Sequence, residues 1–132
     1  MPHTYDTSFA RSFPALPVII YQVEGGLATS PLSALVDTGA DTTLVPTEHL
    51  KTIKADEIYT SRIRTHWGEW HPAAVYIIDL EVNGHRLPGI EVVADNYDNR
   101  ILLGRNVLNK LILLLDGPSS QTDVLSRRPV RL

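Results

Sequence analysis

Residues 35–46 read Leu-Val-Asp-Thr-Gly-Ala-Asp-Thr-Thr-Leu-Val-Pro and place a carboxylate, Asp37, directly after an apolar run. Such a run is typical of a buried strand, and a buried charge has to be paired, hydrogen-bonded or neutralised by a proton. Thr38 adds a hydroxyl that can donate or accept a hydrogen bond, and Gly39 lets a substrate backbone approach closely. The motif predicts a carboxylate that activates water for hydrolysis.

The composition excludes several classes of function. The chain has 132 residues and a formal net charge of -3, which gives no electrostatic footprint for nucleic acid or an anionic membrane. It has no cysteine, so a thiolate nucleophile, a disulfide framework and Cys-ligated zinc are ruled out. No segment approaches the ~20 apolar residues of a membrane span, and the first residues lack the pattern of a signal peptide. We expect a cytoplasmic protein with no nucleic-acid or membrane partner.

Short strands separated by turns fill most of the sequence. We expect a flexible lead-in over residues 1–13 and a single domain over residues 14–132. The pair Asn83-Gly84 between two strand-like runs is a strong hairpin signal, because both residues accept a positive φ. The alternation over residues 58–64 suits a strand exposed on both faces, and with its return strand it predicts a projecting hairpin over about residues 58–78.

Two segments carry helical signals. Residues 105–111 place their apolar side chains at one-face spacing and give the only convincing helix. Residues 46–54 have room for one helical turn, with Thr47 as its cap. The remaining strand and turn signals predict an all-β barrel or sandwich with one short C-terminal helix.

A second motif acts together with the first. Residues 101–108 read Ile-Leu-Leu-Gly-Arg-Asn-Val-Leu, and residues 34–41 read Ala-Leu-Val-Asp-Thr-Gly-Ala-Asp. In this order, with a hairpin between them, the two motifs make the sequence similar to the retroviral-type aspartic proteases, the retropepsin family, over residues 17–115. The resemblance implies a retropepsin-like half-barrel with a flap hairpin, active as a homodimer on polypeptide substrates and without a metal or other cofactor.

The implied mechanism needs two carboxylates that share one proton, one as a base for water and one as an acid for the amide, as is known for aspartic proteases. The sequence holds no second Asp-Thr-Gly or Asp-Ser-Gly. Asp116 precedes Gly-Pro, which is ordinary turn chemistry. We therefore expect the second carboxylate to be Asp37 of another copy, across a two-fold axis. The segments 124–125 and 130–132 are candidate edge strands for this dimer.

The resemblance assigns roles to residues of both motifs and of the hairpin. The expected catalytic residues are Asp37, Thr38 and Gly39; the expected substrate-binding residues are Ala40, Asp41, Trp67 and Gly68; and the expected structural supports are Gly104, Arg105 and Asn106. An ion pair between Asp41 and Arg105 is implied, which would tie the active-site loop to the start of the helix.

The tip of the expected flap leaves two questions open. It reads His-Trp-Gly-Glu-Trp over residues 66–70, with one glycine where family flaps are rich in glycine. Trp67 and Trp70 either cover the substrate or pack against the barrel. The histidines at positions 66 and 71 raise the question of a metal, with His85 or Asp79 as a further ligand. Their spacing matches no recognised ligand set, and we expect no metal.

Two other functions compete with the enzyme. The first is a retropepsin-like domain that dimerises or binds peptide without cleaving it. The second, a phosphatase or nucleotide site built on Asp37 and Asp41, is disfavoured because no phosphate-cradling glycine loop or basic residue lies nearby in the sequence.

Overall fold

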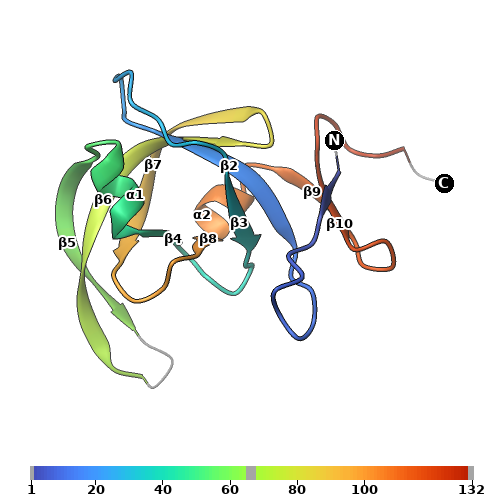
Figure 1. Cartoon of the computed structure of the whole chain (residues 1–132), viewed down its shortest axis with the longest axis horizontal. Helices are drawn as coiled ribbons and strands as arrows, with labels where there is room; N and C mark the ends of the chain where they lie inside the picture. Colours follow the sequence, from blue (N-terminus) through green and yellow to red (C-terminus); the bar gives the residue numbers. More distant parts are fainter. Residues whose placement is uncertain (1, 65–67, 131–132) are drawn as a thin grey trace.

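The computed structural model describes residues 2–64 and 68–130, which form strands joined by turns and two short helices (Figure 1). In chain order the elements are β1 (His3–Thr4), β2 (Ala15–Tyr21), β3 (Leu32–Val36), β4 (Thr43–Pro46), α1 (Thr47–Thr52), β5 (Asp56–Arg64), β6 (Trp70–Val82), β7 (His85–Asp95), β8 (Ile101–Leu103), α2 (Arg105–Leu108), β9 (Ile112–Asp116) and β10 (Gln121–Leu125). Within the described residues, neither helix has the length and apolar character needed to cross a membrane.

The main sheet closes on itself. Seven strands follow one another in the order β2-β3-β8-β4-β7-β6-β5, and β2 also pairs with β6. This additional pairing, from Val18 against Val82 to Tyr21 against Asp79, joins the two sides of the sheet into a barrel. It leaves β5 outside the closed ring, so the β5–β6 hairpin extends away from the barrel (Figure 1). The predicted all-β, retropepsin-like architecture is confirmed.

Alternation along the strands fills the core. In β2 the side chains of Leu16, Val18 and Ile20 are buried, whereas the residues between them are partly exposed. Helix α1 adds Leu50, and Ile53 follows directly after its last residue; both are at most 1% exposed. A helix of six residues is too short to be stable alone, so these two anchors hold it against the barrel.

A smaller apolar cluster lies under the β5–β6 hairpin, apart from the main core. Its buried members are Ala73, Val75 and Val93, and Leu44 and Ile63 pack against them. We call this set the hairpin cluster. The hairpin cluster contains few side chains from β5, because β5 is exposed along nearly all of its length. This exposure confirms what the alternation of its residues predicted.

The local signals located the turns and helices with small shifts. Asn83 and Gly84 have φ values of 47° and 84°, which confirms the predicted hairpin turn. Pro46, not Thr47, takes the N-cap position of α1, and the Thr47 hydroxyl donates to the Asp95 carbonyl at 3.3 Å. The predicted cap is therefore wrong by one residue.

Both segments with helical signals are helices, and the second is shorter than predicted. Helix α2 ends at Leu108, before the expected end at Leu111. The N–H groups of Lys110 and Leu111 donate to carbonyls three residues back, which tightens the chain into a turn toward β9.

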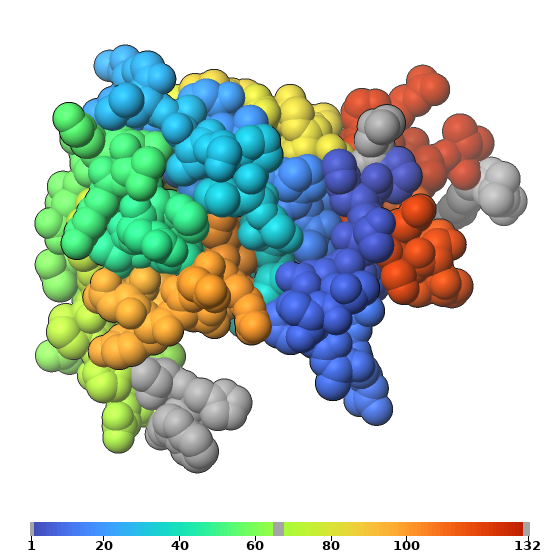
Figure 2. Space-filling view, in the orientation of Figure 1, coloured from blue at the N-terminus to red at the C-terminus, as the bar shows by residue number. Residues whose placement is uncertain are grey.

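The two chain ends meet beside the barrel in a second sheet of order β1-β10-β9. Figure 2 shows the N-terminal residues packed beside the C-terminal segment. The segment expected as a flexible lead-in thus contains a strand, with His3 opposite Thr122. Val124 and Leu125 pair with β9 of the same chain on one side, and on the other side β1 pairs only with Gln121 and Thr122, so their pairing in a dimer stays a prediction. Of the other candidate, Val130 is 87% exposed, and residues 131–132 lie outside the described part.

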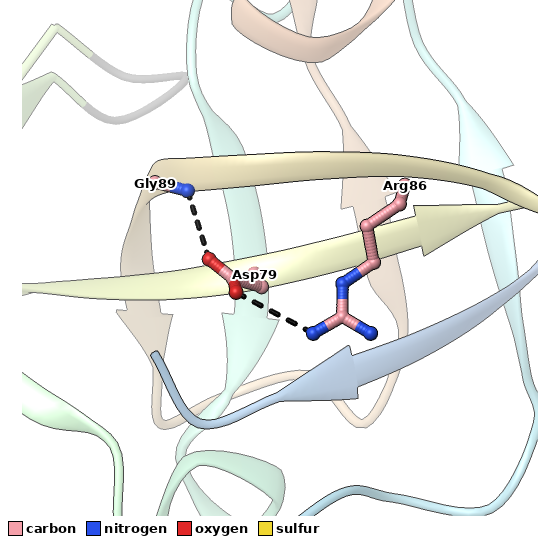
Figure 3. Close-up of polar contacts among 3 residues, drawn as sticks. All are labelled: Asp79, Arg86 and Gly89. Atoms are coloured by element: carbon pink, nitrogen blue, oxygen red, sulfur yellow. Dashed lines mark hydrogen bonds and ion pairs between the residues drawn. The ribbon is translucent and has the colours of Figure 1, made fainter. Parts of the chain in front are cut away.

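A polar contact fixes the place where the barrel closes (Figure 3). The register of β6 and β7 shifts between Ile78 and Leu80, so Asp79 lies in a bulge. Its carboxylate accepts the Gly89 N–H at 2.9 Å and lies 3.4 Å from an Arg86 guanidinium nitrogen. The Arg86 guanidinium lies 3.7 Å above the centre of the Tyr21 ring in β2. Asp79 and Arg86 therefore connect the three strands of the closure, which gives Asp79 a structural role.

Candidate active site

Asp37 stands at the end of two parallel strands. Ala34, Leu35 and Val36 are buried, and β3 pairs in parallel with β8, which aligns Val36 with Leu103. The backbone N–H of Asp37 donates to the Leu103 carbonyl at 3.1 Å, so the ladder extends to this residue. The Asp37 side chain itself is partly exposed. The expectation of a buried charge is therefore wrong for a single chain. Strand β3 ends at Val36, and the side chain of the next residue, Asp37, is partly accessible to solvent.

The turn after Asp37 orients its carboxylate. The Gly39 N–H donates to Asp37 Oδ1 at 2.9 Å, and the Ala40 N–H donates to the Asp37 carbonyl at 3.3 Å. A Cβ on residue 39 would lie 3.2 Å from Asp37 Oδ1, a close approach that glycine avoids. Thr38 is exposed, and its carbonyl accepts a bond from the Arg105 guanidinium at 2.8 Å. The expected bond of its hydroxyl is not present among the described residues.

Thr43 connects the two motifs from a fully buried position. Its hydroxyl donates to Asn106 Oδ1 at 2.8 Å and accepts the Gly104 N–H at 3.0 Å. The Thr43 N–H also donates to Asn106 Oδ1, at 3.0 Å, and Asn106 Nδ2 donates to the Glu91 carbonyl at 2.8 Å. Thr43 is not among the residues predicted for the site. A hydroxyl in an otherwise apolar strand was the available signal, because a buried hydroxyl requires partners.

The loop and α2 are also joined through their backbones. The Arg105 N–H donates to the Ala40 carbonyl at 2.8 Å, and the Asn106 N–H donates to the Asp41 carbonyl at 3.3 Å. The predicted ion pair between Asp41 and Arg105 is wrong: no such pair occurs among the described residues, and the guanidinium reaches Thr38. Arg105 still connects the loop after Asp37 to the start of α2, but its guanidinium binds the Thr38 carbonyl and not the Asp41 carboxylate.

A cavity of about 660 Å³ lies between the β5–β6 hairpin and this loop. The loop and α2 line it with Gly39, Ala40, Asp41, Thr42, Arg105 and Asn106. Strand β5 lines the opposite wall, and the buried side chains of Val75 and Val93 contribute apolar surface. Five of the ten predicted site residues thus line the cavity, namely Gly39, Ala40, Asp41, Arg105 and Asn106, whereas Thr38, Gly68 and Gly104 do not, and Trp67 lies outside the described residues. Asp37 is next to this cavity in the chain but does not line it.

Trp70 and Tyr59 line the cavity, and the sequence left open only whether Trp70 packs against the barrel. Trp70 lines the cavity and is 58% exposed, so it is not packed into the barrel. Gly68 has a φ of 83°, and Trp67 lies outside the described residues. A hydrogen bond to Glu91, then desolvation and the Glu91 charge, raise the pKa of Tyr59. This contact links β5 to β7 at the cavity wall.

The histidines considered as metal ligands have other surroundings. His71 lies 3.3 Å from the Glu69 carboxylate, and Asp79 is bound to Arg86 and Gly89. His66 lies outside the described residues. Within residues 2–64 and 68–130, no three histidine, cysteine or acidic side chains gather as metal ligands.

Comparison with known proteins defines the family. The sequence model of the gag-polyprotein putative aspartyl protease family matches residues 23–110, which include both motifs. The chain belongs to this family. No curated protein matches it.

Solved structures of proteases share the fold. The solution structure of simian foamy virus (mac) protease is 30% identical, with a TM-score of 0.52 over 72% of this chain and 91% of that one. EIAV protease complexed with the inhibitor HBY-793 is 22% identical, with a TM-score of 0.61 over 82% of this chain and 93% of that one. A foamy viral protease-reverse transcriptase in complex with an RNA/DNA hybrid is 22% identical, with a TM-score of 0.56. The match covers 74% of this chain and 12% of that one.

Replacing Thr43 with Val tests the link between the two motifs of this aspartyl protease family member. The change leaves the Gly104 N–H without its acceptor in the interior, which costs about 1–3 kcal/mol of the free energy of unfolding. We expect the melting temperature to fall by roughly 5–10 °C in calorimetry.

Thr122→Val is the matched control. Thr122 is also fully buried, but its hydroxyl has no hydrogen-bond partner in the part of the chain that the structure describes. Its replacement should be neutral or slightly stabilising. Equal losses for both variants would show that the Thr43 network does not stabilise the fold.

Proposed function

We propose that the protein is an aspartic endopeptidase that hydrolyses peptide bonds with two Asp37 carboxylates, one from each subunit of a homodimer. The observation that carries this proposal is the placement of Asp37. Its backbone continues a parallel strand ladder, the Gly39 N–H holds its carboxylate, and the following loop lines a cavity roofed by a hairpin.

The proposed reaction divides the proton transfers between the two carboxylates. The ionised carboxylate takes a proton from water, and the water oxygen bonds to the carbonyl carbon of the substrate. The protonated carboxyl group supplies a proton to the substrate, and the C–N bond then breaks to release an amine and a carboxylic acid. Two carboxylates at one site share a single proton, as in known aspartic proteases, so the acid and the base are available together.

Asp116 is not suited to be the second carboxylate. Its Oδ1 accepts the Ser119 N–H at 3.1 Å in the turn after β9, as Asp-Gly-Pro sequences commonly do. A two-fold axis instead brings Asp37 close to its own copy without any second motif. Homodimerisation is therefore part of the proposed mechanism.

Strand β9 offers a surface for this dimer. It is the outermost strand of its sheet, and its sequence, Ile-Leu-Leu-Leu-Asp, contains none of the lysines or prolines that protect natural edge strands. Leu114 and Leu115 are 48% and 47% exposed. Antiparallel pairing of two β9 strands would cover these leucines and satisfy the free backbone groups.

The β5–β6 hairpin is the proposed flap over an extended substrate. The cavity lies between this hairpin and the loop after Asp37, and two aromatic residues of the hairpin, Tyr59 and Trp70, line it. Closure over a bound peptide would exclude water other than the reacting molecule. The residues Ala40, Asp41 and Gly68 are proposed to contact the peptide, with Trp67 as a further contact.

The proposal is tested by cleavage of a mixed peptide library between pH 4 and 8, at several protein concentrations and with or without pepstatin. We expect pepstatin-sensitive cleavage whose rate rises more steeply than linearly with protein concentration below the dimer Kd. Sedimentation of the same samples gives the dimer fraction. Absence of cleavage by a folded dimer would favour the alternative function, a domain that binds peptide without cleaving it. The single glycine in residues 66–70 of the proposed flap also favours this alternative.

A further inference from the structure

The cavity follows the free edge of β5. No other described strand pairs with the outer edge of β5, whose only partner is β6. Four consecutive residues, Ser61 to Arg64, line the cavity. Side chains of consecutive strand residues point to opposite faces, so a cavity lined by all four reaches both faces of β5 at this edge. An extended peptide in this cavity would lie beside both Arg62 and Arg64.

These two arginines have no charged partner among the residues that the structure describes. Neither Arg62 nor Arg64 forms an ion pair or side-chain hydrogen bond with any residue that the structure describes, and both are exposed. They stand two positions apart on one strand, about 7 Å along the chain. This separation is within the screening length of physiological salt, so their like charges repel each other. A carboxylate between them would relieve this repulsion.

The other charged groups of the cavity are already engaged or lie on the opposite wall. The Arg105 guanidinium donates to the Thr38 carbonyl, and the Glu91 carboxylate holds Tyr59. Asp41 belongs to the loop wall. The hairpin wall therefore presents two uncompensated positive charges to a bound peptide.

Arg64 is also placed toward the tip of the hairpin. A Cβ built on Gly68 would lie 3.5 Å from a terminal nitrogen of the Arg64 guanidinium. Trp70 is the cross-strand neighbour of Arg64 and lines the same cavity. The guanidinium is thus kept near the end of the hairpin that would close over a substrate.

We propose that Arg62 and Arg64 make the enzyme select peptides that carry an aspartate or glutamate side chain near the scissile bond. This inference rests on the proposed peptidase function. The apolar side chains of Leu44, Val75 and Val93 along the cavity suit the aliphatic part of a peptide side chain more than a small inorganic anion.

The test compares three peptides that differ at one position near a cleavage site found in the library, with Glu, Gln or Lys there. We expect kcat/KM for the Glu peptide to exceed that for the Gln peptide about three- to tenfold, the range for two exposed ion pairs. Raising the salt concentration should reduce this ratio. In Arg62→Gln/Arg64→Gln the ratio should fall to about one, while Arg127→Gln/Arg128→Gln, with exposed arginines outside the cavity, should keep it.

Charge reversal provides the sharper variant. Arg62→Glu/Arg64→Glu should prefer the Lys peptide over the Gln peptide, a gain that damage to the fold does not produce. Cleavage without a Glu preference in the wild-type protein, or a wild-type preference for Lys, would overturn the inference.

Binding separates this inference from the proposed chemistry. The same three peptides are titrated, by fluorescence anisotropy, into wild-type protein and into Asp37→Asn. A Glu preference in binding without any cleavage would overturn the peptidase proposal and would support the role of the arginines. Cleavage of all three peptides at equal rates would support the peptidase and overturn the role of the arginines. Neither cleavage nor binding would overturn both.

Discussion

Asp37→Asn is expected to lower kcat/KM for peptide cleavage by about 10³–10⁴-fold, because the amide neither takes a proton from water nor returns one to the leaving amine. The fold should be kept, since Asn has the same shape and its Oδ1 still accepts the Gly39 N–H. We expect an unchanged sedimentation profile and a melting temperature close to that of the wild type. Asp116→Asn, the same substitution in the Asp-Gly-Pro turn after β9, should leave the rate unchanged.

Mixed dimers test whether one site needs both copies of Asp37. If subunits pair at random, adding one equivalent of Asp37→Asn protein to a fixed amount of wild type reduces the wild-type dimers, and so the rate, to about half. If each subunit works alone, the added variant changes nothing. The measurement follows the rate of peptide cleavage after mixing, while wild-type and Asp37→Asn subunits exchange between dimers. A constant rate would contradict the shared site, and cleavage that survives Asp37→Asn alone would show that another residue is catalytic.

Gly104→Ala is expected to destabilise the fold strongly. A Cβ at this position would lie 2.5 Å from the carbonyl carbon and 2.6 Å from the carbonyl oxygen of Thr42, and backbone atoms do not move aside at low cost. We expect a loss of about 3 kcal/mol or more in the free energy of unfolding and a fall of roughly 10–15 °C in the melting temperature. Since Gly104 precedes Arg105 and Asn106, the loop after Asp37 should shift and peptide cleavage should fall as well.

Gly117→Ala controls for the loss of a glycine. A Cβ at position 117 meets no atom within 4 Å, so this variant should change the free energy of unfolding by less than about 0.5 kcal/mol. Equal melting temperatures for the two variants would mean that the Thr42 backbone and Gly104 are not packed as closely as described.

Short-range patterns predicted much of the fold and of the site. The Asp37-Thr-Gly turn, the Asn83-Gly84 hairpin and the two-sided exposure of β5 depend on neighbouring residues, so the sequence contains their full signal. The Gly104 requirement is different. Its φ is -88°, which any residue adopts, and the need for glycine comes only from Thr42, which is distant in the sequence.

Long-range contacts explain the errors. The Asp41–Arg105 ion pair followed from resemblance, but a guanidinium binds the acceptor that the folded chain brings nearest, here the Thr38 carbonyl. Thr43 bonds to Gly104 and Asn106 across more than sixty residues, and no local pattern shows which partner a buried hydroxyl has. Likewise, the polarity of the C-terminal segment did not show that β10 pairs on both sides within its own chain.

The separation of the hairpin cluster from the main core has a consequence for motion. Releasing β5 from the barrel separates Ile63 from the rest of the hairpin cluster and breaks the β5–β6 pairs, and it leaves the closed ring with its β2–β6 pairing intact. Its free energy is therefore a small part of the global free energy of unfolding. Amide hydrogens in β5 should exchange with solvent by this local route, while those of β2 and β3 wait for the whole barrel to open. Strand β5 is in this sense a separate cooperative unit, and its local opening would let the proposed flap admit a chain and release fragments while the barrel stays folded.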